Sequence, residues 1–333
     1  TTEIYTLSLH DALPISTNLS LNSPFKMKDK YTLGFNTSLK NMNRLKSYNI
    51  GYDYILNPEG LKLSLSYSNS DSNPGGNLRN LDLLSNSDTY TIQLNKPYIK
   101  SRAENLNLWL GFNHQNSTAK MLNTQTQDDK IRKIRVGSQY DFVDQYNATN
   151  MFILELHQGL NIDNATCKGD NLASRADGHC DFTKLTLDIT RSQSFQNNLS
   201  LNLGLSGQAT NKALLSSEEF GFGGANYGRA YNSSEITGDH GISFKTEIGY
   251  ILPVNVKHIN MIQPYIFHDI GKVYDIDGQN SSASSAGFGI RTSITKYLSG
   301  NVEWTKPLTK DVNENLPDNG RKSRIFFNFS LRM

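Results

Sequence analysis

The chain of 333 residues is polar overall, with 37% hydrophobic residues and a formal net charge of +2 at pH 7. Its mean hydropathy is -0.51, and it contains no run of about 18 apolar residues, the length that a membrane-spanning helix needs. A helical membrane protein is therefore excluded, and so small a net charge gives no support for nucleic-acid binding. A soluble protein or a membrane β-barrel remains, because a barrel strand is apolar on only one face.

Cys167 and Cys180 are the only cysteines in the sequence. They flank a polar segment that contains Gly and Asp, in which a closed loop forms easily. This spacing makes them candidates for a disulfide in a protein of the cell envelope, and two free thiols in a loop are the alternative.

Residues 1–16 do not share the pattern that follows them. They show no capping signal, and they lack the basic start and the apolar core of a signal peptide. They also resemble a translated sequencing adapter, so we exclude them from the fold as a non-native segment. We then expect the native sequence to continue upstream, with N-terminal domains that are missing here.

From residue 17 onward the dominant period of the hydrophobic residues is two. In 61–68, Leu and Tyr alternate with Lys and Ser, and similar alternation appears in 105–113, 184–189 and 199–206. Strict alternation over about eight residues indicates a strand with one apolar face. Strands close to the roughly 9 to 11 residues that cross a bilayer favour a membrane barrel over a sandwich, whose strands average about 5 to 6.

Read in this way, the sequence predicts fifteen antiparallel strands of an outer-membrane β-barrel over 17–333. Their expected ranges are 17–23, 30–39, 46–56, 61–70, 87–99, 105–118, 129–143, 147–160, 182–195, 198–210, 242–252, 263–273, 283–295, 297–307 and 321–333.

The connections between these strands alternate in length, which predicts the orientation of the barrel. Short connections such as 57–60 and 144–146 take turns with long ones at 71–86, 161–181 and 211–241. Barrels of this kind have short periplasmic turns and long external loops, so the last strand runs inward to a periplasmic C-terminus. Single-chain bacterial barrels have even strand numbers, so we expect one outward strand to be missing before residue 17 and the intact barrel to have sixteen.

The last predicted strand carries Ile325, Phe327, Phe329, Leu331 and Met333 on one face. This stretch resembles the C-terminal signal that the barrel-assembly machinery reads. Met333 stands where the terminal residue is usually aromatic.

The loop after Thr210 holds the most specific motif in the chain. A Gly223-Gly224 pair leads into Gly228-Arg229-Ala230-Tyr231. This loop resembles the signature of the two-partner secretion transporters (TpsB), the haemolysin secretion/activation family of the ShlB/FhaC/HecB type, with Ala230 where Gly is usual.

A second motif agrees with this resemblance in order and spacing. Phe267, Asp269 and Gly271 match the family's Phe-x-Asp-x-Gly strand, and 286–307 resembles its final hairpin, so the resemblance covers essentially 17–333. In the family, the loop arginine pairs with the strand aspartate inside the lumen. The resemblance therefore implies an Arg229 to Asp269 contact, in which a guanidinium fork meets a carboxylate and pins loop 211–241 within the barrel.

The resemblance also implies the function, the location and the partners. We expect an outer-membrane protein of a Gram-negative bacterium that secretes a large unfolded partner, a haemolysin or adhesin, through its lumen. Outer-membrane lipids and the barrel-assembly machinery are the other expected partners, and no cofactor, metal or nucleic acid is expected.

Three rival functions remain open at the level of sequence. A passive porin shares the alternation, and the barrel-assembly or surface-antigen branch of the same superfamily shares the loop arginine. An outer-membrane hydrolase would need a nucleophile or a metal cluster, but none of the histidines after residue 16 forms a pair with metal-ligand spacing. We therefore do not expect an enzyme. These histidines are His114, His157, His179, His240, His258 and His268.

Overall fold

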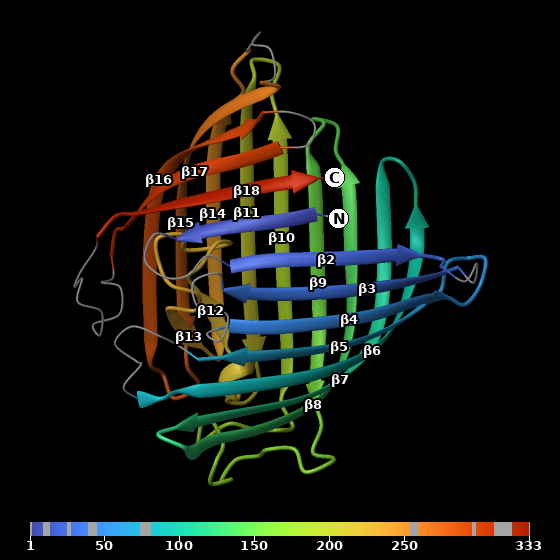
Figure 1. Cartoon of the computed structure of the whole chain (residues 1–333), viewed down its shortest axis with the longest axis vertical. Helices are drawn as coiled ribbons and strands as arrows, with labels where there is room; N and C mark the ends of the chain where they lie inside the picture. The colour runs from blue at the N-terminus through green and yellow to red at the C-terminus, as the bar shows by residue number, and fades with distance from the viewer. Residues whose placement is uncertain are drawn as a thin grey trace.

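The computed structural model describes residues 2–8, 14–24, 28–38, 45–73, 81–253, 259–294, 298–309 and 322–332. Sixteen antiparallel strands close into one barrel, each paired with its neighbours along the chain (Figure 1). The barrel strands are β1 (Thr2–Ser8), β2 (Pro14–Asn22), β3 (Asp29–Ser38), β4 (Leu45–Ile55), β5 (Lys62–Ser72), β6 (Leu84–Lys100), β7 (Glu104–Met121), β8 (Thr124–Val143), β9 (Thr149–Gly159), β10 (Thr183–Ser194), β11 (Leu199–Thr210), β14 (His240–Tyr250), β15 (Met261–Tyr274), β16 (Asn280–Ser293), β17 (Leu298–Pro307) and β18 (Arg324–Arg332). Among the residues described, no helix reaches the length and hydropathy that a membrane span requires.

All fifteen predicted strands are present, and β1 is the sixteenth. It pairs with β18 over seven residues and with β2 through Ile4 and Tyr5, so it joins the two ends of the sheet. This placement corrects the exclusion of residues 1–16 from the fold. The physical reason is that β2 and β18 would otherwise be open edges with unpaired backbone groups, and a short segment with Ile, Tyr and Thr satisfies them.

The two faces of the barrel wall differ in chemistry. Large apolar side chains of the strands point outward and stay exposed, such as Leu65 at 38% and Ile266 at 60%. Polar and charged side chains at the alternate positions point into the lumen, where Asp269 is fully buried. This alternation follows from the side-chain period of two along a strand, and it gives the barrel the apolar exterior and polar interior of an outer-membrane protein.

Strands β7 and β8 are longer than the alternation predicted. They continue to a two-residue turn at Leu122 and Asn123, whose φ angles of 50° and 62° are both positive. Positive φ at both central residues is the type I′ geometry that matches the twist of the flanking strands. The polar segment 117–129 therefore forms a hairpin beyond the band of outward apolar residues, where neither face needs to be hydrophobic.

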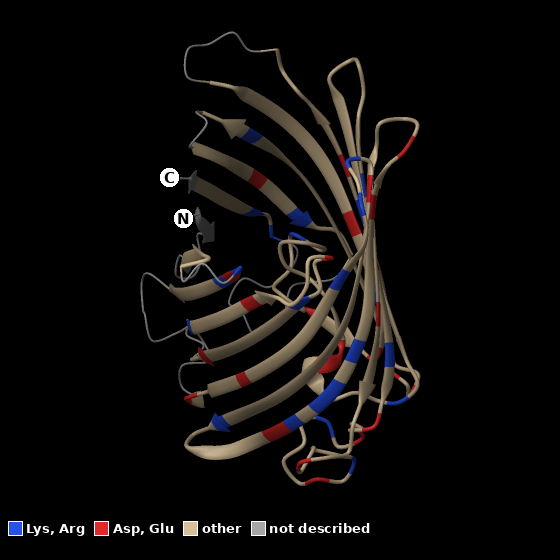
Figure 2. Cartoon of the chain, turned by 90° about the vertical axis from the view of Figure 1, so that its right-hand side faces the viewer, with Lys and Arg blue, Asp and Glu red and all other residues tan. Residues whose placement is uncertain are grey.

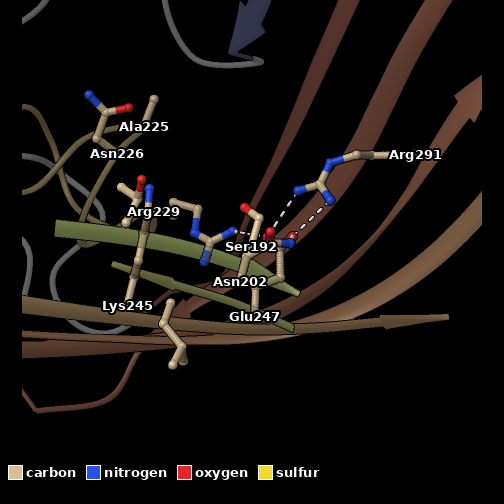
Figure 3. Close-up of a pocket in the computed structure, with 10 residues that line it drawn as sticks. Ser192, Asn202, Ala225, Asn226, Arg229, Lys245, Glu247 and Arg291 are labelled. Carbon is tan, nitrogen blue, oxygen red and sulfur yellow. Dashed lines mark hydrogen bonds and ion pairs between the residues drawn. The ribbon is translucent and has the colours of Figure 1, made fainter. Parts of the chain in front are cut away.

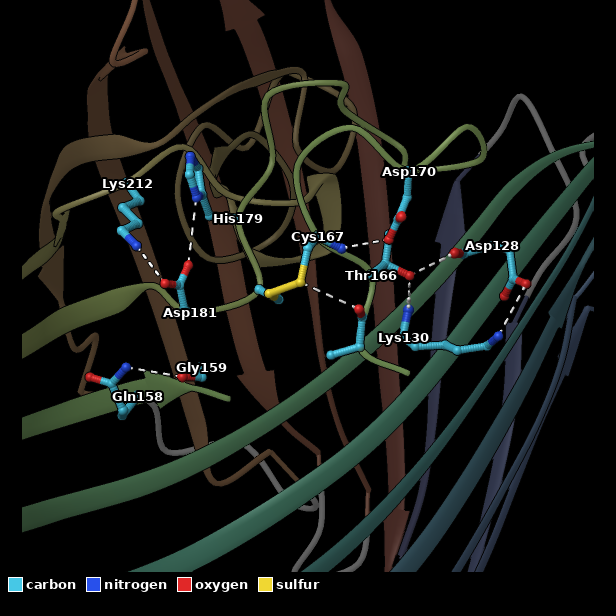
Figure 4. Close-up of a disulfide and its surroundings, with 12 residues drawn as sticks. Asp128, Lys130, Gln158, Gly159, Thr166, Cys167, Asp170, His179, Asp181 and Lys212 are labelled. Carbon is cyan, nitrogen blue, oxygen red and sulfur yellow. Dashed lines mark hydrogen bonds and ion pairs between the residues drawn. A yellow bond between two sulfur atoms is a disulfide. The ribbon is translucent and has the colours of Figure 1, made fainter. Parts of the chain in front are cut away.

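Beyond the end of β9 at Gly159, the free edge of β8 is covered by loop 160–182 (Figure 4). The pairing of β8 with β9 stops at Lys133, and the backbone of Lys130 instead exchanges hydrogen bonds with Thr166 at 2.9 Å. Cys167 and Cys180 form a disulfide within this loop. The covered edge is thus protected from pairing with another chain.

Loop 211–239 carries a short 3₁₀ helix, η2 (Ser216–Glu218), and a two-stranded sheet of β12 (Phe220–Phe222) and β13 (Ile236–Gly238). Both views show it between opposite walls of the barrel (Figures 1 and 2). Its contacts with the wall include inward-facing side chains of β14, β15 and β17 and the backbone of β16, and the loop therefore occupies the lumen.

Candidate functional site

Arg229 reaches the lumen wall from the tip of loop 211–239. Its Nη2 and Nε atoms donate to the two oxygens of Asp269 at 2.9 and 3.0 Å. The backbone N–H groups of Gly228 and Arg229 also donate to Asp269, at 3.2 and 3.1 Å. One carboxylate thus accepts four hydrogen bonds from the loop, in the bidentate arrangement that a planar guanidinium makes with a carboxylate.

Two further carboxylates flank this pair. Arg229 Nη1 lies 2.9 Å from Glu247 on β14 and 3.3 Å from Glu303 on β17. Arg291 on β16 bridges to the other oxygen of Glu247 at 2.7 Å (Figure 3). Burial lowers the pKa of Arg229, but Asp269, Glu303 and Glu247 raise it above its usual value, so the guanidinium stays charged.

Two aromatic side chains also hold Arg229 and the loop tip against the wall. The Arg229 guanidinium carbon lies 3.5 Å from the centre of the Phe267 ring, a cation–π contact. The Tyr231 hydroxyl donates to the backbone carbonyl of Ser284 at 3.0 Å. The loop tip is therefore held by charge, by ring stacking and by a hydrogen bond to the next strand.

Two glycines of the motifs allow this close approach. Gly228 has φ 77°, and a Cβ atom there would lie 2.7 Å from the Phe222 ring. A Cβ on Gly271 would lie 2.2 Å from the same ring, which is fully buried against the wall. Any side chain at Gly271 would displace Phe222. The glycine of the Phe-x-Asp-x-Gly strand therefore leaves the space into which Phe222 of the loop packs. The remaining pair, Gly223 and Gly224, also has positive φ and forms the turn after β12.

The loop has a small hydrophobic core of its own. Its buried members from the loop and the wall are Phe220, Phe222, Tyr231, Ile236, Val273 and Ala283. Beside this core, a polar cavity of about 480 Å³ opens next to Arg229 and is lined by Ser192, Asn202, Asn226 and Lys245 among others (Figure 3). The lumen around the arginine is therefore polar and accessible to solvent, while the loop itself is packed.

The C-terminal residues lie where the alternation placed them, as far as the structure describes them. Phe329 is 39% exposed on the outer face, and Phe327 pairs with the outward residue Val302 of β17. Leu331 lies in β18 opposite Leu298, and Met333 lies outside the described residues.

A cluster of three carboxylates lies at the end of the lumen where β14 begins and β15 ends. Oxygens of Glu219, Asp239 and Asp275 fall within 4.8 Å of one another. The guanidinium of Arg175, from loop 160–182, lies 3.1 Å from Glu219, 2.6 Å from Asp239 and 3.6 Å from Asp275. An arginine thus occupies the place that a metal cation would take, and it joins the disulfide-bonded loop to the loop in the lumen.

This junction predicts a pH dependence. Burial raises the pKa of Glu219 to about 6, with Asp275 and Asp239 acting in the same direction and Arg175 opposing them. Because the Glu219 carboxyl group binds its proton more tightly in this packed position than in water, packing of the segment around Glu219 is fully favoured below pH 4.5 and weakens as the pH rises through 6. A spin label on Ser217, an exposed residue two positions before Glu219, should become several-fold more mobile between pH 5 and pH 7.5. Glu219→Gln should abolish this change, and a change of equal size in that variant would contradict the assignment.

Sequence reasoning missed several residues of the site. Glu247, Glu303 and Arg291 contact Arg229 or its partners, but they lie on three different strands. Their only sequence signal is that each is a charged residue at an inward position of its strand. Alternation gives the face of a residue but not its depth, so the sequence alone did not bring them together.

Residues 10–292 match the family described as haemolysin secretion/activation protein ShlB/FhaC/HecB. The heme/hemopexin transporter protein HuxB of Haemophilus influenzae is 25% identical, over 92% of this chain and 59% of HuxB. HuxB of strain 86-028NP is 23% identical over the same shares. The chain thus spans about three fifths of the length of these relatives.

Solved structures share the fold at low sequence identity. CdiB from Escherichia coli has a TM-score of 0.80 at 15% identity, over 99% of this chain and 62% of that chain. CdiB from Acinetobacter baumannii has a TM-score of 0.74 at 16% identity, over 99% and 59%. BamA from Haemophilus ducreyi lacking POTRA domains 1-3 has a TM-score of 0.71 at 10% identity, over 99% and 70%. With the family match over most of its length, the chain is an outer-membrane β-barrel that belongs to the haemolysin secretion/activation family ShlB/FhaC/HecB.

Proposed function

We propose that the intact protein is a two-partner secretion transporter, which moves a large partner exoprotein in an unfolded state through this barrel. The observation that carries the proposal is the contact of Arg229 with Asp269 inside the lumen. A loop packed in the lumen obstructs a continuous pore, and a loop held by side-chain contacts can be released. The curated relatives are described as heme/hemopexin transporters, which supports a transported cargo.

In this proposal, loop 211–239 is a latch. Its tip is held by Arg229, Tyr231 and the glycines of the motif, and its seat is formed by Phe267, Asp269 and Gly271. No nucleotide is at hand beyond the inner membrane, so folding of the emerging substrate would drive export. We assign no catalytic step to the chain.

Two other partners follow from the outer surface. Outer-membrane lipids would cover the outward apolar side chains, and the barrel-assembly machinery would insert the barrel by recognising β18. The outward position of Phe329 in that strand supports this role.

Among the rival functions, a passive porin fits least well, because the packed loop obstructs the lumen. The likeness to BamA is the observation that bears on the barrel-assembly branch, but at 10% identity it shows a shared fold and not a shared function. The family match favours secretion over both.

Co-expression tests the proposal. The full-length gene is expressed in a Gram-negative host together with a neighbouring gene for a large, repeat-rich exoprotein, and the exoprotein is measured in the medium. We expect the exoprotein in the medium only when the transporter is present. Equal export without it, or an exoprotein that stays in the periplasm with it, would contradict the proposal.

A further inference from the structure

A second set of charges holds loop 211–239 far from Arg229. Glu218, in η2, pairs with Lys133 of β8 and with Lys184 of β10, the latter at 2.6 Å. The side chains of Glu218, Lys184 and Lys133 are only 2%, 7% and 12% exposed. The backbone carbonyl of Glu218 also accepts hydrogen bonds from Lys184 and from Gln208 of β11, both at 3.0 Å.

The electrostatics of this triad make the carboxylate its central member. Lys133 and Lys184 point into the lumen from strands separated by β9, and each finds its short contact on a different oxygen of Glu218. Burial raises the pKa of Glu218. The two ammonium groups have the larger, opposite effect and lower the pKa to about 2, so the carboxylate remains ionised at neutral pH. If the loop left the wall, two buried ammonium groups would lose their shared counter-ion.

Packing around the triad strengthens the same attachment. Leu214 and Leu215, just before η2, are fully buried against Phe182 and Ile131. Arg175 also contacts this segment, through the Leu214 carbonyl at 3.1 Å. However, Arg175 comes from another loop, whereas Glu218 ties the segment to the barrel wall.

The two attachments use different parts of the barrel. Arg229 is held by side chains of β14, β15 and β17, and Glu218 by side chains of β8 and β10. None of the contacts described is shared between them. Release of the loop tip is therefore expected to leave the contacts of Glu218 with Lys133 and Lys184 intact.

We propose that Glu218 is a second anchor of loop 211–239, which holds its lead-in to the wall independently of Arg229 and must be released separately before the lumen opens. The inference rests on the proposed function only in that the lumen has to open. Glu218 is a positioning residue, because it affects the path of the substrate only by holding loop 211–239 in the lumen.

Spin labels on two exposed loop residues test the independence of the anchors without any secreted partner. Ser217 reports the lead-in and Asn226 reports the tip. The native cysteines are bonded to each other, so a single introduced cysteine is labelled selectively. Glu218→Gln should raise the mobile fraction at Ser217 several-fold and leave Asn226 unchanged, and Arg229→Ala should do the reverse.

The matched control is Asp181→Asn, which breaks an exposed lysine–carboxylate pair with Lys212 between the neighbouring loops. This variant should move neither label. An unchanged Ser217 label in Glu218→Gln would overturn the proposal, and so would equal mobilisation of both labels. Heat-modifiable migration on gels shows whether each variant still forms the barrel.

Removal of both ammonium groups separates the ion pair from simple packing. The variant Lys133→Met with Lys184→Met keeps apolar stems at both positions but leaves the Glu218 carboxylate without a counter-ion, so it should mobilise the Ser217 label as Glu218→Gln does. A label as immobile as in the native protein would show that packing rather than charge holds the segment, against the proposal.

Single-channel recording in planar bilayers tests the need for both releases. We expect Glu218→Gln and Arg229→Ala each to open rarely, and the double variant to show wide openings at least ten times as often as either. Full opening in Arg229→Ala alone would contradict a second anchor. Because these readouts need no exoprotein, they stay separate from the co-expression test of secretion.

Discussion

Arg229→Ala is expected to abolish secretion of the partner exoprotein while the barrel still folds into the outer membrane. The substitution leaves Asp269, Glu247 and Glu303 close together without their shared cation. Breaking a buried ion pair by removing one partner costs about 3–5 kcal/mol, which corresponds to a loss of roughly 100-fold or more in the held state. The exported exoprotein is measured in the medium, and barrel folding is measured by heat-modifiable migration.

Two variants sharpen this result. Arg229→Lys keeps the charge but loses the planar fork that contacts both oxygens of Asp269, so it should secrete at an intermediate level. Lys120→Ala removes an exposed charge near the tip of the β7–β8 hairpin and should secrete normally. Normal secretion by Arg229→Ala would count against a functional latch at this residue.

Ile266→Arg is expected to destabilise the barrel strongly. Ile266 lies near the middle of β15 and points outward with 60% of its surface exposed. An arginine on the lipid face of a barrel costs about 2–4 kcal/mol at the bilayer midplane. The free energy of unfolding is measured by urea titration in phospholipid vesicles, with the fluorescence of Trp109 and Trp304 as the signal.

The control for this variant is Ile276→Arg, the same change just beyond the end of β15. Ile276 is 46% exposed in the loop between β15 and β16, where an arginine side chain stays in water. We expect its effect to stay within about 1 kcal/mol, because charges near or beyond the interface cost little. Equal effects at the two positions would show that the outer face of β15 does not meet hydrocarbon.

The strands could be predicted because the alternation has a direct physical cause. A residue such as Leu65 faces outward because the strand period is two and only one face meets lipid. The same rule failed at β7 and β8, where both faces of the hairpin are polar and the alternation disappears although the strands continue. It also gave no reason to keep Thr2–Ser8, whose place depends on the unpaired edges of β2 and β18.

The candidate site could be predicted only in part. Arg229 and Asp269 were placed together through the family resemblance, and the structure brings them into contact. The segment 215–220 that contains Glu218 favours the secretion branch by its resemblance to the family, but the contact of Glu218 with the wall was not predicted, because its partners Lys133 and Lys184 are distant in sequence and meet it only through the register of the strands. Pairing of this kind depends on the depth of each residue in the barrel, which periodicity does not encode.

A double-mutant cycle on Arg229 and Asp269 tests most directly whether their contact holds the loop in the lumen. Arg229→Ala, Asp269→Asn and the double variant are compared by their free energies of unfolding in vesicles. If the two side chains act as one unit, the double variant should be little less stable than either single variant, so the coupling energy should be close to the cost of one substitution, about 3 kcal/mol. Losses that simply add would mean that the two residues act separately and that the latch does not exist.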